Sequence, residues 1–363
     1  MRVLHLGAVA ALLAGSVIGC GSGGGSGGAG GTTASGGSGG SGAHAGGAGT
    51  GGAGTGGMGT GGTGGTGTGG GSGGAGTGGR GFPEGGPWVS FYGPGDAIDI
   101  DRVASAFRII NIDVDPDTDN FTDAQITALK AGGKNRVISY LNVGSCEEYR
   151  SYWDAAPPGL ASCVGSGALT TIYGGYPDER WANLGNVDYQ DLIVEHVAPR
   201  LAARGVDGFF LDNMEVVEHG AGASEGPCDA ACSQGGLDLV WRLRQKFPDK
   251  LIVMQNASSD VTRKGTTHGV AYPSLLDGVS HEEVYSYSGD DQSRAEMLAW
   301  RDMMLTVAGR PFWLACEEYV GACDAASKPA ADALSAKAAA DGLSAYVTDE
   351  SGSQITPCFW ADF

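Results

Sequence analysis

The chain has 363 residues, of which 67 are glycine, and a formal net charge of −19 at pH 7. This acidic balance argues against nucleic acid as a ligand, because phosphate contacts need clustered lysine and arginine. Of the 67 glycines, 36 fall between Gly21 and Gly81, in a segment of Gly, Ser, Thr and Ala. Such a segment buries too little apolar surface to offset its backbone entropy, so we expect a flexible tether before one large folded domain.

The first twenty residues are typical of an exported lipoprotein. Arg2 precedes an apolar run that ends in Val17-Ile18-Gly19-Cys20, which resembles a bacterial lipobox. We therefore expect a signal peptide over residues 1–19 and a lipidated Cys20, with a linker over residues 20–86. These features predict a location in the bacterial cell envelope, with the membrane contacted only through the lipid anchor. Plain secretion with an unmodified Cys20 is the alternative.

Seven cysteines follow Cys20, and disulfides are their default use in an exported protein. Close spacing suggests three pairs and leaves Cys358 unpaired. The pairs are Cys146 with Cys163, Cys228 with Cys232, and Cys316 with Cys323. Zinc at Cys228 and Cys232 is the alternative, but no second close pair or histidine cluster accompanies them, and we expect no metal and no cofactor.

Residues 87–363 alternate between apolar strand patterns and helical patterns. Strands are predicted at 88–92, 107–113, 136–143, 206–212, 251–256, 276–282, 312–317 and 344–348. Helices are clearest at 122–131, 188–204, 237–247, 292–307 and 329–340. Eight strands alternating with helices favour a (β/α)8 TIM barrel, here expected as a monomer. A doubly wound open sheet would require the first or last strand to be misread.

Carboxylates and amides recur where these strands end. They are Asp113, Asn142, Asp212, Asn256, Glu282, Glu283, Glu317, Glu318 and Asp349. Unpaired buried charges are costly, so such a cluster implies chemistry: either paired carboxylates for glycosidic hydrolysis or oxygen ligands for a hard cation. The sequence has no DxDxDG loop, and nearby aromatic residues such as Tyr92, Tyr140 and Tyr319 suit stacking on sugar rings, which favours hydrolysis.

Seven blocks between about Phe107 and Tyr319 resemble the endo-α-1,4-polygalactosaminidase family of glycoside hydrolases, family 114. They are the strand ending at Asp113, YLNVGSCEEYR (140–150), YPDERWANL (176–184), GVDGFFLDNME (205–215), VMQNA (253–257), DGVSHEE (277–283) and RPFWLACEEY (310–319). The chain departs from the family pattern at Asn183 and Gln255, where Asp and Lys are usual, and this bears on the substrate more than on the reaction.

The resemblance implies a TIM barrel in which Asp212 and Glu282 are the catalytic carboxylates. By analogy with retaining α-glycosidases, Asp212 is assigned as nucleophile and Glu282 as acid/base. Glu283 is the competitor of Glu282, because neighbouring strand residues face opposite sides. Further candidates for substrate contact are Asp113, Tyr140, Glu147, Glu179, Trp181, Asn213, Asn256, Glu318 and Tyr319.

The sequence thus predicts a tethered enzyme that cuts α-1,4 bonds within a cationic, galactosamine-rich polysaccharide. Two alternatives remain open: a carbohydrate-binding module on a degenerate barrel, and a barrel hydrolase of another α-linked glycan.

Overall fold

The computed structural model describes residues 81–83, 86–287, 291–307, 309–352 and 354–363. The predicted signal peptide, the predicted lipidation site Cys20 and nearly all of the predicted linker lie outside these residues. Within the described part of the chain, no helix is long and apolar enough to cross a membrane.

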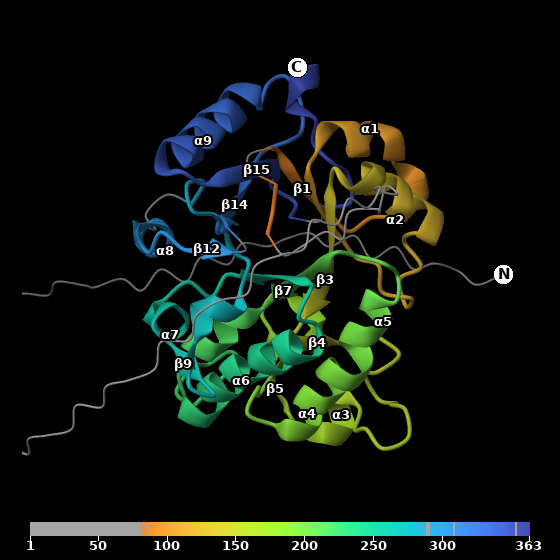
Figure 1. Ribbon diagram of the computed structural model, residues 1–363, viewed down its shortest axis with the longest axis vertical. Coiled ribbons are helices and arrows are strands. Elements are labelled where there is room, and N and C mark those ends of the chain that lie inside the picture. Colours follow the sequence, from red (N-terminus) through yellow and green to blue (C-terminus); the bar gives the residue numbers. More distant parts are fainter. Residues whose placement is uncertain (1–80, 84–85, 288–290, 308, 353) are drawn as a thin grey trace, which may run out of the picture. The chain divides into compact units, whose positions relative to one another are not determined.

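Eight parallel strands form the barrel (Figure 1), hydrogen-bonded in the order β1-β2-β3-β7-β8-β11-β14-β15. Their bounds are β1 Trp88–Phe91, β2 Ile109–Ile112, β3 Arg136–Asn142, β7 Gly208–Asp212, β8 Leu251–Gln255, β11 Gly278–Glu282, β14 Trp313–Val320 and β15 Ser344–Asp349. The first and last strands meet where Trp88 Nε1 donates to the carbonyl oxygen of Ser344 at 3.0 Å. The predicted (β/α)8 barrel is confirmed, and each of the eight predicted strands is present.

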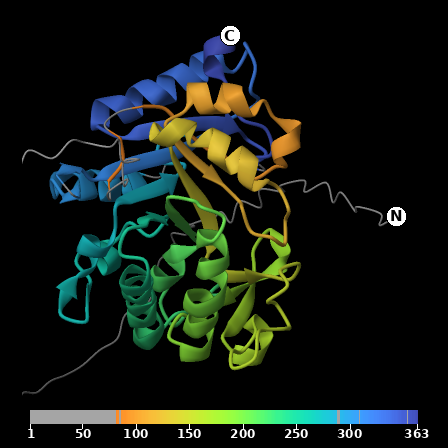
Figure 2. The ribbon, with the colours of Figure 1, turned by 45° about the vertical axis from the view of Figure 1, so that its right-hand side comes forward.

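Helices cover the outside of this sheet (Figure 2). Their bounds are α1 Ile100–Ala106, α2 Asp123–Leu129, α3 Cys163–Ser166, α4 Val187–Leu192, α5 Ala198–Ala202, α6 Ala230–Lys246, α7 Asp260–Arg263, α8 Asp291–Asp302 and α9 Lys328–Asp341. A capping box begins α2: Thr122 Oγ1 accepts from the Gln125 amide, and Gln125 Oε1 accepts from the Thr122 amide. The helix predicted at 188–204 is α4 and α5 joined by a π-helical turn, Ile193–Val197.

Aromatic side chains pack together inside the barrel near the end where the strands begin. The Trp88 ring lies 5.4 Å from the Trp313 ring and 5.6 Å from the Tyr346 ring, measured between centroids, and it is fully buried. This packing fills the end of the barrel where the strands begin. A cavity can therefore open only at the other end, where the strands finish.

A small antiparallel sheet is inserted between β3 and α4. It consists of β4 Ser145–Glu147, β5 Leu169–Tyr173 and β6 Tyr176–Ala182, with β6 in the centre. The sequence did not predict it. Two hairpins, β9 Thr266–Thr267 with β10 Val270–Ala271 and β12 Thr306–Val307 with β13 Arg310–Pro311, also lie outside the barrel sheet.

The disulfides confirm two of the three predicted pairs. Cys146 bonds to Cys163 and Cys228 to Cys232, but Cys323 bonds to Cys358 and leaves Cys316 as a buried free thiol. The prediction of a Cys316–Cys323 bond was therefore wrong. Cys316 lies inside β14, whereas Cys323 follows the end of that strand and comes next to a segment 35 residues further along the chain.

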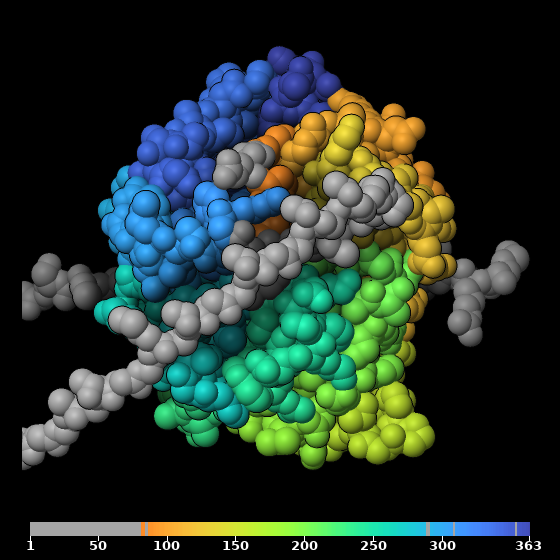
Figure 3. Space-filling view, in the orientation of Figure 1, coloured from red at the N-terminus to blue at the C-terminus, as the bar shows by residue number. Residues whose placement is uncertain are grey.

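The last residues of the chain lie beside the first helix on the molecular surface (Figure 3). Arg102 of α1 forms an ion pair with Asp362, and its guanidinium carbon lies 3.8 Å from the centroid of the Phe359 ring. This contact joins the C-terminal residues to α1.

Candidate active site

A cavity of about 590 Å³ opens where the barrel strands end. Side chains at the ends of five barrel strands line it, namely Tyr92, Asp113, Asp212, Gln255 and Glu282. Further walls come from the inserted sheet, through Glu147, Tyr173, Tyr176, Asp178 and Glu179, and from the C-terminal residues Ser351, Gly352 and Gln354. The cavity therefore occupies the end of the barrel at which TIM-barrel enzymes carry out chemistry.

Asp212 is the last residue of β7 and points into this cavity. Burial raises the pKa of its carboxyl group to about 8, and the charges of Glu282 and Glu179 add to the rise, while a hydrogen bond from Tyr140 acts against it. In the unliganded cavity Asp212 therefore carries a proton at neutral pH.

Glu282 ends β11 and is held by two neighbours. Asn256 Nδ2 donates to Glu282 Oε2 at 2.8 Å, and the Glu282 backbone amide donates to Asn256 Oδ1 at 3.0 Å. The Tyr319 hydroxyl donates to Glu282 Oε1. These hydrogen bonds fix the orientation of the Glu282 carboxyl group.

Glu283 faces away from the cavity that contains Asp212. It is exposed and has a left-handed backbone with φ of 55°. Asn213 and Asn256 also have left-handed backbones, with φ of 59° and 66°. Three successive barrel strands, β7, β8 and β11, thus each end in a left-handed residue, which turns the chain sharply away from the rim.

Glu179 comes from β6 and is hydrogen-bonded by residues of two barrel loops. Its Oε1 accepts from Asn142 Nδ2 at 2.7 Å, from Asn213 Nδ2 at 2.9 Å and from the Ser145 hydroxyl. Burial and the charge of Glu147 raise its pKa to about 7. The loops pack backbone to backbone: a Cβ on Gly144 would lie 1.7 Å from the Asn213 carbonyl oxygen, so only glycine fits there.

Arg150 joins two more of the predicted carboxylates. Its Nε donates to Glu147 Oε2 at 2.6 Å and its Nη2 to Asp113 Oδ2 at 3.1 Å, and all three side chains are buried. Burial raises the pKa of Asp113 to about 6, and the positive charge of Arg150 limits the rise. Glu147 and Arg150 thus form an ion pair, and both residues also line the cavity.

Aromatic side chains line the cavity on two sides. The Tyr92 and Tyr140 rings lie 5.0 Å apart, and the Tyr173 and Tyr176 rings stack at 5.1 Å with an interplanar angle of 26°. Tyr176 keeps 46% of its surface exposed. A half-exposed ring supported by a second ring is suited to stacking on a sugar.

Four of the predicted contact residues do not line this cavity. Asn256 and Tyr319 act on Glu282, as described. Trp181 is buried, with its ring centroid 4.3 Å from that of Tyr173, so it packs rather than faces substrate. Glu318 points out of the barrel, where its carboxylate accepts from the backbone amides of Tyr285 and Ser286. For Trp181 and Glu318 the prediction of substrate contact is corrected.

Glu317, rather than Glu318, is the residue of β14 that faces the barrel interior. It pairs in register with Glu282 on the neighbouring strand, and its side chain has no exposed surface. Neither of its carboxyl oxygens has a hydrogen-bond partner among the described residues. Burial raises its pKa well above the ordinary value, and the charges of Glu282 and Asp212 raise it further, so the folded protein keeps the Glu317 proton to higher pH than the unfolded chain does.

Because the buried Glu317 carboxyl group has a raised pKa, we expect the stability of the folded protein to depend on pH. Above the ordinary pKa of 4.5 the unfolded state loses the Glu317 proton while the folded state keeps it, so stability falls as pH rises. The contribution is about 1.4 kcal/mol per pH unit until the folded pKa is reached. Glu317→Gln removes this titration. We therefore expect the melting temperature of the variant relative to the wild type to increase steadily between pH 5 and pH 8. A constant difference over this range would contradict the assignment.

A barrel whose strand ends converge on several carboxyl groups and aromatic rings has the features of a glycoside hydrolase. Residues 86–233 match the sequence profile of the glycoside-hydrolase family GH114. The family resemblance of the motifs is thereby confirmed for this segment of the chain. The matched segment contains Asp113, Tyr140, Glu147, Glu179 and Asp212, whereas Glu282 lies outside it.

Known structures and sequences agree with this placement. The glycoside hydrolase domain of PelA from Pseudomonas aeruginosa superposes with a TM-score of 0.54 at 14% identity, over 75% of this chain and 97% of that domain. Its E218A variant gives the same TM-score at 13% identity, with the same coverage of both chains. At this identity the two structures support the fold. An uncharacterised protein of Deinococcus radiodurans is 26% identical over 247 residues, covering 66% of this chain and 72% of its own length.

Proposed function

We propose that this chain is an exported, lipid-anchored, endo-acting glycoside hydrolase that cleaves α-1,4 bonds in a galactosamine-rich polysaccharide without a cofactor. The observation that carries the proposal is the convergence of Asp212 and Glu282 on one cavity from β7 and β11. Glycosidic hydrolysis needs two carboxyl groups with different proton affinities on either side of the bond. The location in the cell envelope depends on the lipobox-like motif at Cys20 alone.

The charge of the cavity supports a cationic substrate. Asp113, Asp178, Glu147, Glu179, Asp212 and Glu282 all line it. Arg150 is the cation among the lining residues, and its guanidinium is already paired with Asp113 and Glu147. Burial is the main cause of the raised pKa values of Asp212 and Glu179, and neighbouring carboxylates add to both; an ammonium group in the cavity would offset that part of the rise.

The assignment of Asp212 as nucleophile requires the carboxylate form. The pKa of about 8 means that the free enzyme must lose this proton before attack. A bound ammonium group would lower the pKa and favour that loss. Glu282, whose carboxyl group is oriented by Asn256 and Tyr319, would then protonate the leaving oxygen and later activate water.

The dependence of kcat/KM on pH distinguishes Asp212 as nucleophile from Asp212 as general acid. With an N-acetylated substrate, which does not itself titrate near neutrality, kcat/KM reports the groups of the free enzyme. If Asp212 is the nucleophile, kcat/KM rises with an apparent pKa of about 8. If Asp212 is instead the general acid, activity falls above that pH. We expect kcat/KM to rise with pH in this way. We also expect the corresponding rise in kcat to occur at lower pH with the deacetylated polymer than with the acetylated one.

The proposed substrate is tested by product analysis. Purified polygalactosamine and its N-acetylated form are incubated with the enzyme, and new reducing ends and oligosaccharides are measured. Release of internal fragments from either polymer supports the proposal. Tight binding without new reducing ends would instead indicate a carbohydrate-binding barrel, and cleavage of a different α-linked glycan alone would keep the hydrolase and change the substrate.

A further inference from the structure

One wall of the cavity is built by residues that follow the last barrel strand. We call residues 349–352 and 354–358 the C-terminal strap. Its residues Ser351, Gly352 and Gln354 line the same cavity as Asp212 and Glu282. The strap lies beyond the segment that matches the family profile, which ends at residue 233.

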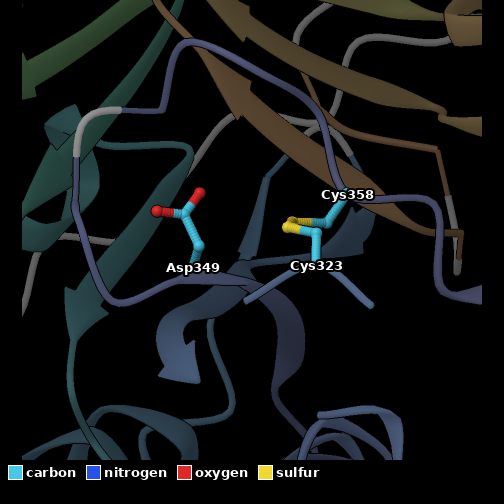
Figure 4. Close-up of side chains that lie close together, drawn as sticks. All are labelled: Cys323, Asp349 and Cys358. Carbon is cyan, nitrogen blue, oxygen red and sulfur yellow. A yellow bond between two sulfur atoms is a disulfide. The ribbon is translucent and has the colours of Figure 1, made fainter. Parts of the chain in front are cut away.

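The strap is fixed at several points. Asp349 Oδ1 accepts from the Ser351 amide at 3.0 Å and forms the turn with which the strap leaves β15. The Gln354 carbonyl oxygen accepts from the Tyr92 amide at 2.8 Å, which attaches the strap to the end of β1. The Cys323–Cys358 disulfide ties its far end to the loop after β14, as Figure 4 shows.

The side chains in Figure 4 also raise the question of a metal site. Ligand atoms of Cys323, Asp349 and Cys358 lie within 4.8 Å of one another. The two sulfur atoms are bonded to each other, however, and Asp349 is engaged by the turn. These three residues therefore hold the strap in place. The strap residues that can contact a substrate are the ones that line the cavity.

Gln354 is the strap residue with unused hydrogen-bonding capacity. Its side chain is 4% exposed, and its Oε1 has no hydrogen-bond partner among the described residues. Its backbone is left-handed, with φ of 49°, a conformation that glutamine rarely adopts. A buried acceptor without a partner and a strained backbone both cost stability, and such features are concentrated at binding sites.

We propose that Gln354 is a specificity-determining residue of the proposed hydrolase, whose side-chain amide oxygen accepts a hydrogen bond from a sugar hydroxyl or nitrogen-bound hydrogen. Thr118, Asn120 and Tyr92 line the same cavity and add polar groups to it. Both a protonated amino group and an N-acetyl amide present an N–H donor. This inference rests on the proposed function and assigns one wall of its cavity to recognition of the substrate.

The test compares Gln354→Ala with Ile355→Ala, a neighbouring strap residue that is 57% exposed and does not line the cavity. Loss of one hydrogen bond in a site that cannot rehydrate freely is expected to raise KM about 10-fold. Because Gln354 does not contact the catalytic carboxyl groups in any described hydrogen bond, kcat should stay within about 2-fold of the wild type. Ile355→Ala should change neither constant.

Equal KM values for the two variants, with melting temperatures like that of the wild type, would overturn the inference while the proposed function stands. If the wild type cleaves neither polymer, the proposed function fails, and calorimetric titration with galactosamine oligosaccharides then tests Gln354 separately. About 10-fold weaker binding by Gln354→Ala would support the inference, and unchanged binding would overturn it.

A second pair of variants tests whether the Cys323–Cys358 disulfide holds the strap in its position at the cavity. Cys323→Ser with Cys358→Ser releases the strap, whereas Cys228→Ser with Cys232→Ser removes a disulfide next to α6. We expect the first double variant to raise KM as much as Gln354→Ala does, and the second to leave KM unchanged. A strap that is merely structural would lower the melting temperature without this difference in KM.

Discussion

Replacing Asp212 by asparagine, or Glu282 by glutamine, is expected to lower kcat on a galactosamine polymer by about 10²–10⁴-fold or more. Each substitution keeps the shape of the side chain and removes its ability to ionise. Asn256 and Tyr319 can still hold an amide at position 282, so the loss should be confined to chemistry. The measurement is steady-state release of reducing ends, together with circular dichroism to show that the barrel is intact.

Glu283→Gln is the matched control for Glu282→Gln. The two residues are adjacent, but Glu283 is exposed and lies outside the cavity that contains Asp212. We expect Glu283→Gln to retain most of the wild-type kcat. A larger loss in Glu283→Gln than in Glu282→Gln would show that the second carboxylate has been assigned to the wrong residue.

Arg150→Met is expected to lower the free energy of unfolding by about 3–5 kcal/mol at pH 7, because it leaves two buried carboxylates without their cation. Asp113 and Glu147 are the partners, and the Arg150 side chain is 3% exposed. Without Arg150 the pKa of Asp113 should rise above its wild-type value of about 6, because the positive charge of Arg150 limits that pKa. Above about pH 6 the folded variant then keeps a proton that the folded wild type and the unfolded state have lost, so the defect grows as pH rises from about 6 to 7.

Urea unfolding at pH 4.5 and at pH 7 measures this change. Lys264→Met provides the control, because Lys264 pairs with Asp260 on the surface, where an ion pair contributes about 0–1 kcal/mol. Arg150→Lys should lie between the two, since lysine keeps the charge but lacks the fork that reaches both carboxylates. A defect of equal size at both pH values would argue that Arg150 stabilises through packing.

The barrel could be predicted because each strand combines an apolar run with a polar end. In β7, burial on both faces gives the apolar run Phe209 to Leu211, and the change to Asp212 marks the rim. The choice between Glu282 and Glu283 required the register of β11 against its neighbours. The same holds for Glu317 and Glu318, where the sequence analysis chose the residue that faces outward.

Other parts of the site depend on contacts between distant segments. The inserted sheet was missed because Tyr176 to Ala182 contains a proline and three consecutive charged residues, so it lacks the apolar alternation of a typical strand. Cys323 pairs with Cys358 because of where the chain returns after β15, whereas sequence spacing favoured the nearer Cys316 as the partner of Cys323 and left Cys358 unpaired. Gln354 carries no local signal at all, because its role depends on a wall that forms only after the barrel has closed.

The three disulfides and the contacts inside the barrel stabilise different parts of the fold. Cys146, Cys228 and Cys323 all lie in segments that follow barrel strands, on the side where the cavity opens. Among the described residues, none of the three disulfides joins one barrel strand to another. We therefore expect reduction to loosen the segments around the cavity more than the barrel itself.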